Sequence, residues 1–106
     1  MGASDDIVFL RDAGRPNGEY VPRDGACISA DDRGFVFGDG VYEVVRAYYG
    51  KLFMLEAHMA RFQRSLREIC LNGGDLSDFE AIMRELLERR GLLHCDATVY
   101  AQITRG

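Results

Sequence analysis

The chain has 106 residues, which is enough for one compact domain and too few for two of ordinary size. Hydrophobic residues make up 47% and charged residues 28% of it, a globular composition that excludes a disordered or fibrous protein. The 13 Lys and Arg residues against 17 Asp and Glu residues give a net charge of −4 without a basic run, so no nucleic-acid partner is expected.

Three further features narrow the class of protein. No apolar stretch approaches the roughly 18 residues that cross a bilayer, and residues 1–6 are too polar for a signal peptide, so we expect no membrane partner. The cysteines are widely spaced, at Cys27, Cys70 and Cys95, which favours reduced thiols and a cytoplasmic location. Lysine is nearly missing, and Lys51 is the single candidate for any mechanism that needs one.

The first forty residues favour a hairpin followed by a loop. Short apolar runs at 7–10 and 19–21 flank a turn-rich segment. Its Asn17-Gly18 pair favours a tight turn because both residues tolerate positive φ. The glycine-rich residues 22–40 predict a loop whose backbone is pressed close against something else.

A second hairpin is predicted after this loop. Residues 41–49 are β-branched and aromatic and lead into Gly50, which places a turn there with Lys51 at or near its tip. Both faces of the strand are largely apolar. We therefore expect a central strand that is covered on both sides.

Two helices and a strand are predicted next. Apolar residues recur at helical spacing over 55–69, and the Asn-Gly-Gly at 72–74 is expected to end this helix. The Ser-x-x-Glu at 77–80 has the spacing of a capping box, which predicts a second helix that ends at Gly91. Residues 97–104 alternate as in a strand with one polar face. This order predicts an α+β fold, an antiparallel or mixed sheet with two helices packed on one face.

Spacing alone suggests two groups of candidate binding residues. His58 and Arg61 lie three positions apart and share a helix face with Ser65. A planar arginine fork beside hydrogen-bonding groups suits an anion, although a solvated helix face has the same spacing and is the commoner outcome. Tyr42 and Tyr100, on different predicted strands, either place their hydroxyls in one pocket or pack as ordinary aromatics at its rim.

Other chemistries find no support in the sequence. His94 and Cys95 are adjacent, and adjacent residues of a strand point apart, so no metal site is expected. No serine lies in a Gly-x-Ser-x-Gly context, which leaves hydrolase chemistry unsupported. The glycines of 34–40 lack the Lys-Ser/Thr of a P-loop and do not predict nucleotide binding.

Three segments together carry a family resemblance. Residues 32–45 read DRGFVFGDGVYEVV, His58-x-x-Arg61 and Ser65 follow, and residues 100–106 read YAQITRG. In this combination the chain resembles the N-terminal domain of class IV (fold-type IV) pyridoxal-phosphate-dependent aminotransferases from about residue 20 to residue 106. Within that family the Gly-Asp-Gly-Val-Tyr-Glu segment is most similar to the D-amino acid transaminases.

The resemblance implies a role for four residues. Arg61 matches the arginine that binds the phosphate of pyridoxal 5'-phosphate. Tyr42 matches a tyrosine at the substrate carboxylate, Val44 matches a residue on the substrate side, and Tyr100 matches an aromatic that helps to close the same pocket. The substrates it implies are a small D-amino acid such as D-alanine and a 2-oxo acid, and the assembly it implies is a homodimer.

One departure from the family limits what this chain is expected to do alone. Members of the family are more than twice as long, and their Schiff-base lysine lies in a second domain. Lys51 matches a hairpin turn and cannot replace it. We therefore expect residues 1–106 to be the N-terminal domain of a larger two-domain aminotransferase, with no catalytic residue in this chain and no activity from it alone.

Two alternatives stay open at this point. The first keeps the family and changes the reaction, to that of a branched-chain aminotransferase or an aminodeoxychorismate lyase. The second is a non-catalytic, dimerising interaction domain that has kept the fold and lost the chemistry.

Overall fold

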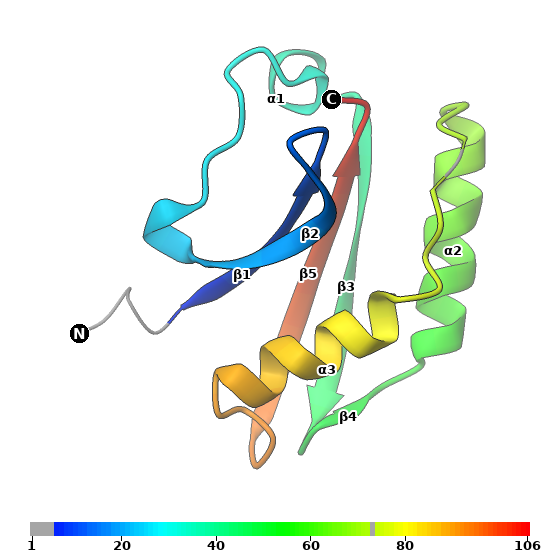
Figure 1. Ribbon diagram of the computed structural model, residues 1–106. Coiled ribbons are helices and arrows are strands. Elements are labelled where there is room, and N and C mark those ends of the chain that lie inside the picture. The colour runs from blue at the N-terminus through cyan, green and yellow to red at the C-terminus, as the bar shows by residue number, and fades with distance from the viewer. Residues whose placement is uncertain (1–5, 73) are drawn as a thin grey trace.

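The computed structural model describes residues 6–72 and 74–106, and in them strands and helices form an α+β fold as predicted (Figure 1). An N-terminal antiparallel hairpin consists of β1 (Ile7–Asp12) and β2 (Arg15–Pro22) and leads into a short 3-10 turn, η2 (Arg23–Gly25). A second sheet has the strand order β4-β3-β5, with β3 (Gly40–Tyr48) between β4 (Lys51–Leu52) and β5 (Asp96–Thr104). The helices are α1 (Arg33–Phe37), α2 (Leu55–Glu68) and α3 (Phe79–Arg89).

The turn of the first hairpin lies earlier than predicted. It is formed by Ala13 and Gly14, whereas Asn17 and Gly18 belong to β2. Gly18 has a φ of 82° and lies against the Phe9 ring, where a Cβ would come within 2.1 Å of a ring carbon. Glycine is therefore required at position 18 by close packing against an aromatic ring, not by the hairpin turn.

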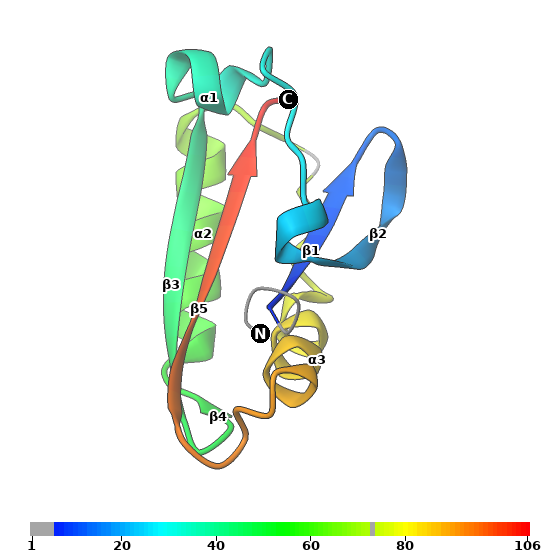
Figure 2. The same cartoon turned by 90° about the vertical axis from the view of Figure 1, so that its left-hand side faces the viewer.

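Strand β3 is the central strand of its sheet, but only one of its faces is covered. It pairs with β5 along its whole length, from Gly40 opposite Thr104 to Tyr48 opposite Asp96. The prediction that both faces would be covered is wrong for the described part of the chain. Both long helices lie on the same side of the sheet, and α2 runs beside β3 in both views (Figures 1 and 2).

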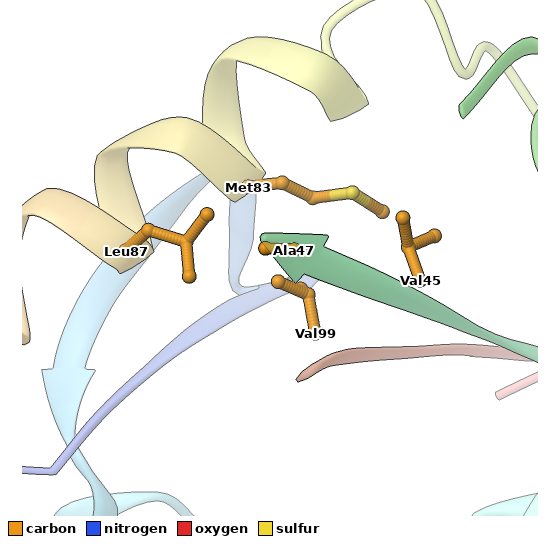
Figure 3. Packing of buried hydrophobic residues seen from close by; sticks show 5 residues of the cluster. All are labelled: Val45, Ala47, Met83, Leu87 and Val99. Atoms are coloured by element: carbon orange, nitrogen blue, oxygen red, sulfur yellow. The ribbon is translucent and has the colours of Figure 1, made fainter. Parts of the chain in front are cut away.

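The core lies between this covered face and the two helices. Val45, Ala47 and Val99 of the sheet pack against Met83 and Leu87 of α3, and all five are buried (Figure 3). The side chains of Phe62 and Leu66 on α2 are also fully buried. The predicted packing of two helices on one face of the sheet is thus confirmed.

The helix boundaries follow the sequence signals in part. Gly91 ends α3 as predicted, with a φ of 68°. Helix α2 ends earlier than expected, because Cys70 already takes the left-handed conformation with a φ of 58°. The predicted terminator at 72–74 is therefore not used, and its central glycine lies outside the described residues.

The start of α3 and the whole of α1 differ from prediction. No side chain of a described residue caps α3, and the capping box at 77–80 does not form. The Asp75 carboxylate instead accepts a hydrogen bond from the backbone N–H of Ser77 at 2.9 Å. In the predicted loop, residues 33–37 form a helical turn because the Asp32 carboxylate caps it, accepting from the Gly34 N–H at 2.8 Å.

Candidate functional site

A buried carboxylate on β3 is hydrogen bonded to the side chains of an arginine and a histidine on α2. Glu43 is on the covered face of the strand and is only 3% exposed. Arg61 donates to it twice, from Nε to Oε2 at 2.8 Å and from Nη2 to Oε1 at 2.7 Å. His58 is one helical turn earlier, and its Nδ1 lies 2.9 Å from Oε1. Their spacing of three residues on α2 therefore brings both side chains over one carboxylate.

The hydrogen bonds of this cluster keep the Glu43 carboxylate ionised. The pKa of Glu43 is lowered to about 2, chiefly by the hydrogen bonds from Arg61. Burial raises this pKa, and the contact with His58 lowers it further. An ionised carboxylate only accepts hydrogen bonds, so Nδ1 of His58 carries a proton and donates. The pKa of Arg61 is raised, chiefly by the bonds and charge of Glu43, and the Tyr42 phenol adds a smaller rise.

Among the described residues, the Arg61 side chain is bound at one edge and has no hydrogen-bond partner at the other. It is 58% exposed, in contrast to its buried partner. A guanidinium has five N–H donors, and Glu43 takes the Nε donor and one Nη2 donor. Both Nη1 donors and the second Nη2 donor remain on the other edge. Arg61 and His58 are therefore not a freely solvated helix face, since both side chains contact the Glu43 carboxylate.

A second group of predicted residues meets on the opposite, open face of the sheet. Val44 lies opposite Tyr100 in the pairing of β3 with β5, and Tyr42 lies opposite Gln102. The Tyr42 and Tyr100 rings stack with their centroids 5.6 Å apart. The Tyr100 hydroxyl donates to Oε1 of Gln102 at 2.9 Å. Tyr42, Val44 and Tyr100 thus form one exposed surface of two aromatic rings and an aliphatic side chain.

The predicted residues therefore fall into two groups on either side of β3. Tyr42, Val44 and Tyr100 come together on the open face, whereas Arg61 is on the helix side. Neighbouring residues of a strand point to opposite faces, so Tyr42 and Glu43 belong to different groups.

The glycine-rich segment closes the end of the sheet beside Gly40. The Thr104 hydroxyl donates to the Asp32 carboxylate at 2.9 Å, which ties α1 to the end of β5. A Cβ on Gly34 would come within 2.2 Å of the Thr104 methyl group, so this close approach requires glycine. The segment is pressed against another part of the chain, as predicted, and that part is β5.

Glu43 is the residue that sequence reasoning missed. It alternates with Val41, Val45 and Ala47 on an otherwise apolar strand face, and a carboxylate there requires a partner. That signal was present, but the partners are 15 and 18 positions away, at His58 and Arg61.

Lys51 is far from both groups of residues. It pairs with Tyr48 at the other end of β3, five residues from Glu43. At a rise of about 3.3 Å per residue, this places it roughly 16 Å along the strand from the cluster.

Among the residues that the structure describes, no group of three or more His, Cys, Asp or Glu could hold a metal ion. No helix in the described ranges is long and apolar enough to cross a membrane.

Comparison with known proteins agrees with the resemblance in the sequence. The family model described as amino-transferase class IV matches residues 40–106, which include β3, α2, α3 and β5. The chain is 44% identical over 91 residues to the D-alanine aminotransferase of Staphylococcus haemolyticus, a match that covers 85% of this chain and 32% of that protein. It is 43% identical over 95 residues to that of Staphylococcus aureus (strain N315), with the same coverage.

A third relative comes from another genus. The D-alanine aminotransferase of Bacillus licheniformis is 42% identical over 92 residues, covering 85% of this chain and 31% of that protein. The chain spans about a third of the length of these relatives. Because the family model matches more than half of its residues, the chain belongs to the class IV aminotransferase family.

Proposed function

We propose that residues 1–106 are the N-terminal domain of a longer, two-domain class IV aminotransferase that depends on pyridoxal 5'-phosphate. Its reaction would move an amino group between a D-amino acid such as D-alanine and a 2-oxo acid. The observation that carries this proposal is the identity of 42–44% to proteins named D-alanine aminotransferase over 85% of the chain.

The residues present suit the phosphate of that cofactor. Arg61 has an exposed donor edge, and the guanidinium fork matches the oxygens of a phosphate. Arg61 would therefore hold the phosphate, with Glu43 and His58 behind it. When bound, pyridoxal 5'-phosphate supplies an electron sink that stabilises negative charge at the substrate Cα.

The open face of the sheet would serve the substrate. The Tyr42 hydroxyl would hydrogen bond to the substrate carboxylate, and Val44 would offer an apolar contact to the substrate side chain. The Tyr100 ring stacks on Tyr42 and is steadied by Gln102, so it would keep the Tyr42 ring in place. Exposed aromatic side chains of this kind also suit a surface that is covered in a homodimer.

The lysine that links the cofactor would come from outside these residues. Lys51 is the single lysine of the chain and lies at the far end of β3 from Arg61 and Tyr42. The chain alone would then have no catalytic residue and no transaminase activity. Its contribution would be to bind the phosphate and to form one wall of the substrate site.

The first test is the product of the complete reading frame. Its intact mass is expected to exceed twice the 11.9 kDa of residues 1–106. The purified protein, given D-alanine and 2-oxoglutarate, is expected to form pyruvate, measured with a coupled lactate dehydrogenase assay. A preference for branched-chain L-amino acids, or pyruvate release from aminodeoxychorismate, would replace this reaction with one of the alternatives. A product near 11.9 kDa that forms a dimer indifferent to the cofactor would indicate the interaction domain.

A variant tests the assignment of Arg61. In the complete protein, Arg61→Ala is expected to weaken cofactor binding by about 2–5 kcal/mol, because it removes one partner of a charge-assisted contact. The matched control is Arg64→Ala, an exposed arginine on the same helix, which should leave binding unchanged. Equal binding by the Arg61 and Arg64 variants would contradict the assignment.

A further inference from the structure

The Glu43–Arg61 contact fixes the direction of the arginine. Glu43 is on a strand in the core, and its two oxygens receive three hydrogen bonds in total, two from Arg61 and one from His58. Its carboxylate is therefore held by the sheet and by α2 together. The exposed end of Arg61 is oriented from behind by a buried group.

An unpaired arginine at this position would have no such orientation. Arginine loses much of its rotamer freedom when it is ordered, and its planar fork binds a phosphate well only in one orientation. Glu43 occupies the Nε and Nη2 edge and leaves the Nη1 and Nη2 edge free. The cost of ordering this side chain is thus met when the protein folds, before any ligand binds.

We propose that Glu43 is a positioning residue, which holds the Arg61 guanidinium so that its free edge faces a phosphate monoester. This inference rests on the proposed function, in which Arg61 binds the cofactor phosphate. It adds a residue of β3 to the phosphate site, and Glu43 does so without contacting the ligand.

The direction in which Glu43→Gln changes the affinity for a phosphate distinguishes a positioning role of Glu43 from a purely electrostatic one. The negative charge of Glu43 repels a phosphate bound to the other edge of the same guanidinium. If charge balance were its whole effect, replacing Glu43 with neutral glutamine would strengthen phosphate binding. If Glu43 positions Arg61, the same replacement weakens phosphate binding, because an amide offers one acceptor oxygen where the carboxylate offers two.

The experiment uses ligands that cannot react with a lysine. Pyridoxine 5'-phosphate has an alcohol in place of the aldehyde, and pyridoxine also lacks the phosphate. Isothermal titration of both ligands into the apo form of the complete reading-frame product measures the phosphate contribution without catalysis. Glu43→Gln is expected to bind pyridoxine 5'-phosphate about tenfold more weakly, because the loosened Arg61 side chain then has to be ordered when the ligand binds. Its affinity for pyridoxine should be unchanged.

The matched control is Glu68→Gln, which removes an exposed carboxylate from α2, the helix that carries Arg61. It should bind both ligands as the wild type does. Tighter or unchanged binding of pyridoxine 5'-phosphate by Glu43→Gln would overturn the proposal. Because glutamine at this buried position can also prevent folding, Glu43→Asp provides a second test. It keeps the charge but is shorter by one methylene, so wild-type affinity in this variant would also overturn the proposal.

Arg61→Ala separates this inference from the function on which it rests. If that variant binds pyridoxine 5'-phosphate as tightly as the wild type does, the assignment of Arg61 to the phosphate is wrong, and the positioning role falls with it. If Arg61→Ala loses binding while Glu43→Gln keeps it, the proposed function stands and only the role of Glu43 is rejected.

Discussion

On one side of β3 the side chains of Glu43, Val45 and Ala47 are buried under the helices, and on the other side those of Tyr42, Val44 and Tyr48 are exposed. The covered face has to satisfy every polar group internally, and Glu43 achieves this with three hydrogen bonds from α2. The open face has no such requirement, and its tyrosines offer rings and hydroxyls to a ligand or to another part of the protein.

The two faces of this one strand therefore differ in what their side chains contribute, stability on the covered face and binding on the open face. Side chains on the covered face contribute to the free energy of unfolding through burial and through the Glu43 cluster. Side chains on the open face contribute little to it and can be shaped for binding. The predictions below test this separation in variants that differ only in the face they change.

The largest expected effect is in the buried layer beneath the covered face, on α2. Phe62→Ala should lower the free energy of unfolding by about 3–5 kcal/mol, because it removes a fully buried ring that packs edge-on against Phe79. Tyr100→Ala removes a ring of similar size from the open face and should cost less than about 1 kcal/mol. Urea denaturation followed by far-UV circular dichroism measures both. Similar losses in the two variants would contradict the separation.

The Glu43 cluster should make the stability depend on pH. The folded-state pKa of Glu43 is about 2, against an ordinary value of 4.5, so the stabilisation is complete above pH 4.5. As the pH falls from 4.5 to about 2, the unfolded chain takes up the proton first and the stabilisation is lost. The loss should be on the order of 2–3 kcal/mol, allowing for solvent screening at the exposed Arg61.

Urea denaturation at a series of pH values between 7 and 3 checks this prediction. The wild type should lose stability more steeply below pH 4.5 than a folded Glu43→Gln variant does. The exposed Glu68→Gln control should follow the wild-type curve. A Glu43→Gln variant with the wild-type pH dependence would show that another carboxylate is responsible.

Two neighbouring valines provide the closest comparison of the faces. Val45 is 0% exposed and Val44 is 41% exposed, although they are adjacent on β3 and have the same side chain. Val45→Ala should cost about 2 kcal/mol for the lost burial and the cavity, and Val44→Ala less than about 1 kcal/mol. Equal costs in residues 1–106 would contradict the burial difference. A higher cost of Val44→Ala in the complete protein would show that the open face is covered there.

The sequence predicted what depends on neighbouring residues. The apolar spacing of residues 55–69, the glycine at position 91 and the alternation over 97–104 each describe one element, and each was confirmed. The capping box at 77–80 failed because it competes with another local contact, in which the Asp75 carboxylate accepts from the Ser77 N–H. Element identity was thus better predicted than the contacts at element ends.

The site was harder to predict because its contacts join distant segments. The pairing of Glu43 with Arg61 depends on how α2 crosses β3, and no local pattern encodes it. The coverage of β3 could not be predicted either, because an apolar strand face is compatible with burial by this domain or by another surface. The stacking of Tyr42 on Tyr100 follows from a register that only the paired strands define.

The smallest expected effect on stability belongs to the tyrosine pair of the open face. In a double-mutant cycle, the coupling of Tyr42 with Tyr100 should be about 0.5–1 kcal/mol, as for other aromatic pairs.

The Tyr42 hydroxyl should matter more for substrate binding than for the free energy of unfolding. Tyr42→Phe keeps the ring and removes the hydroxyl. Under the proposed function, the KM of the complete protein for D-alanine should therefore rise several-fold, while the free energy of unfolding stays unchanged. Tyr48→Phe is the matched control, since Tyr48 is exposed on the same face at the far end of β3. If Tyr48→Phe raised the KM as much, the effect could not be assigned to a substrate contact at Tyr42, and the open face would act on the reaction only as a surface that other parts of the protein cover.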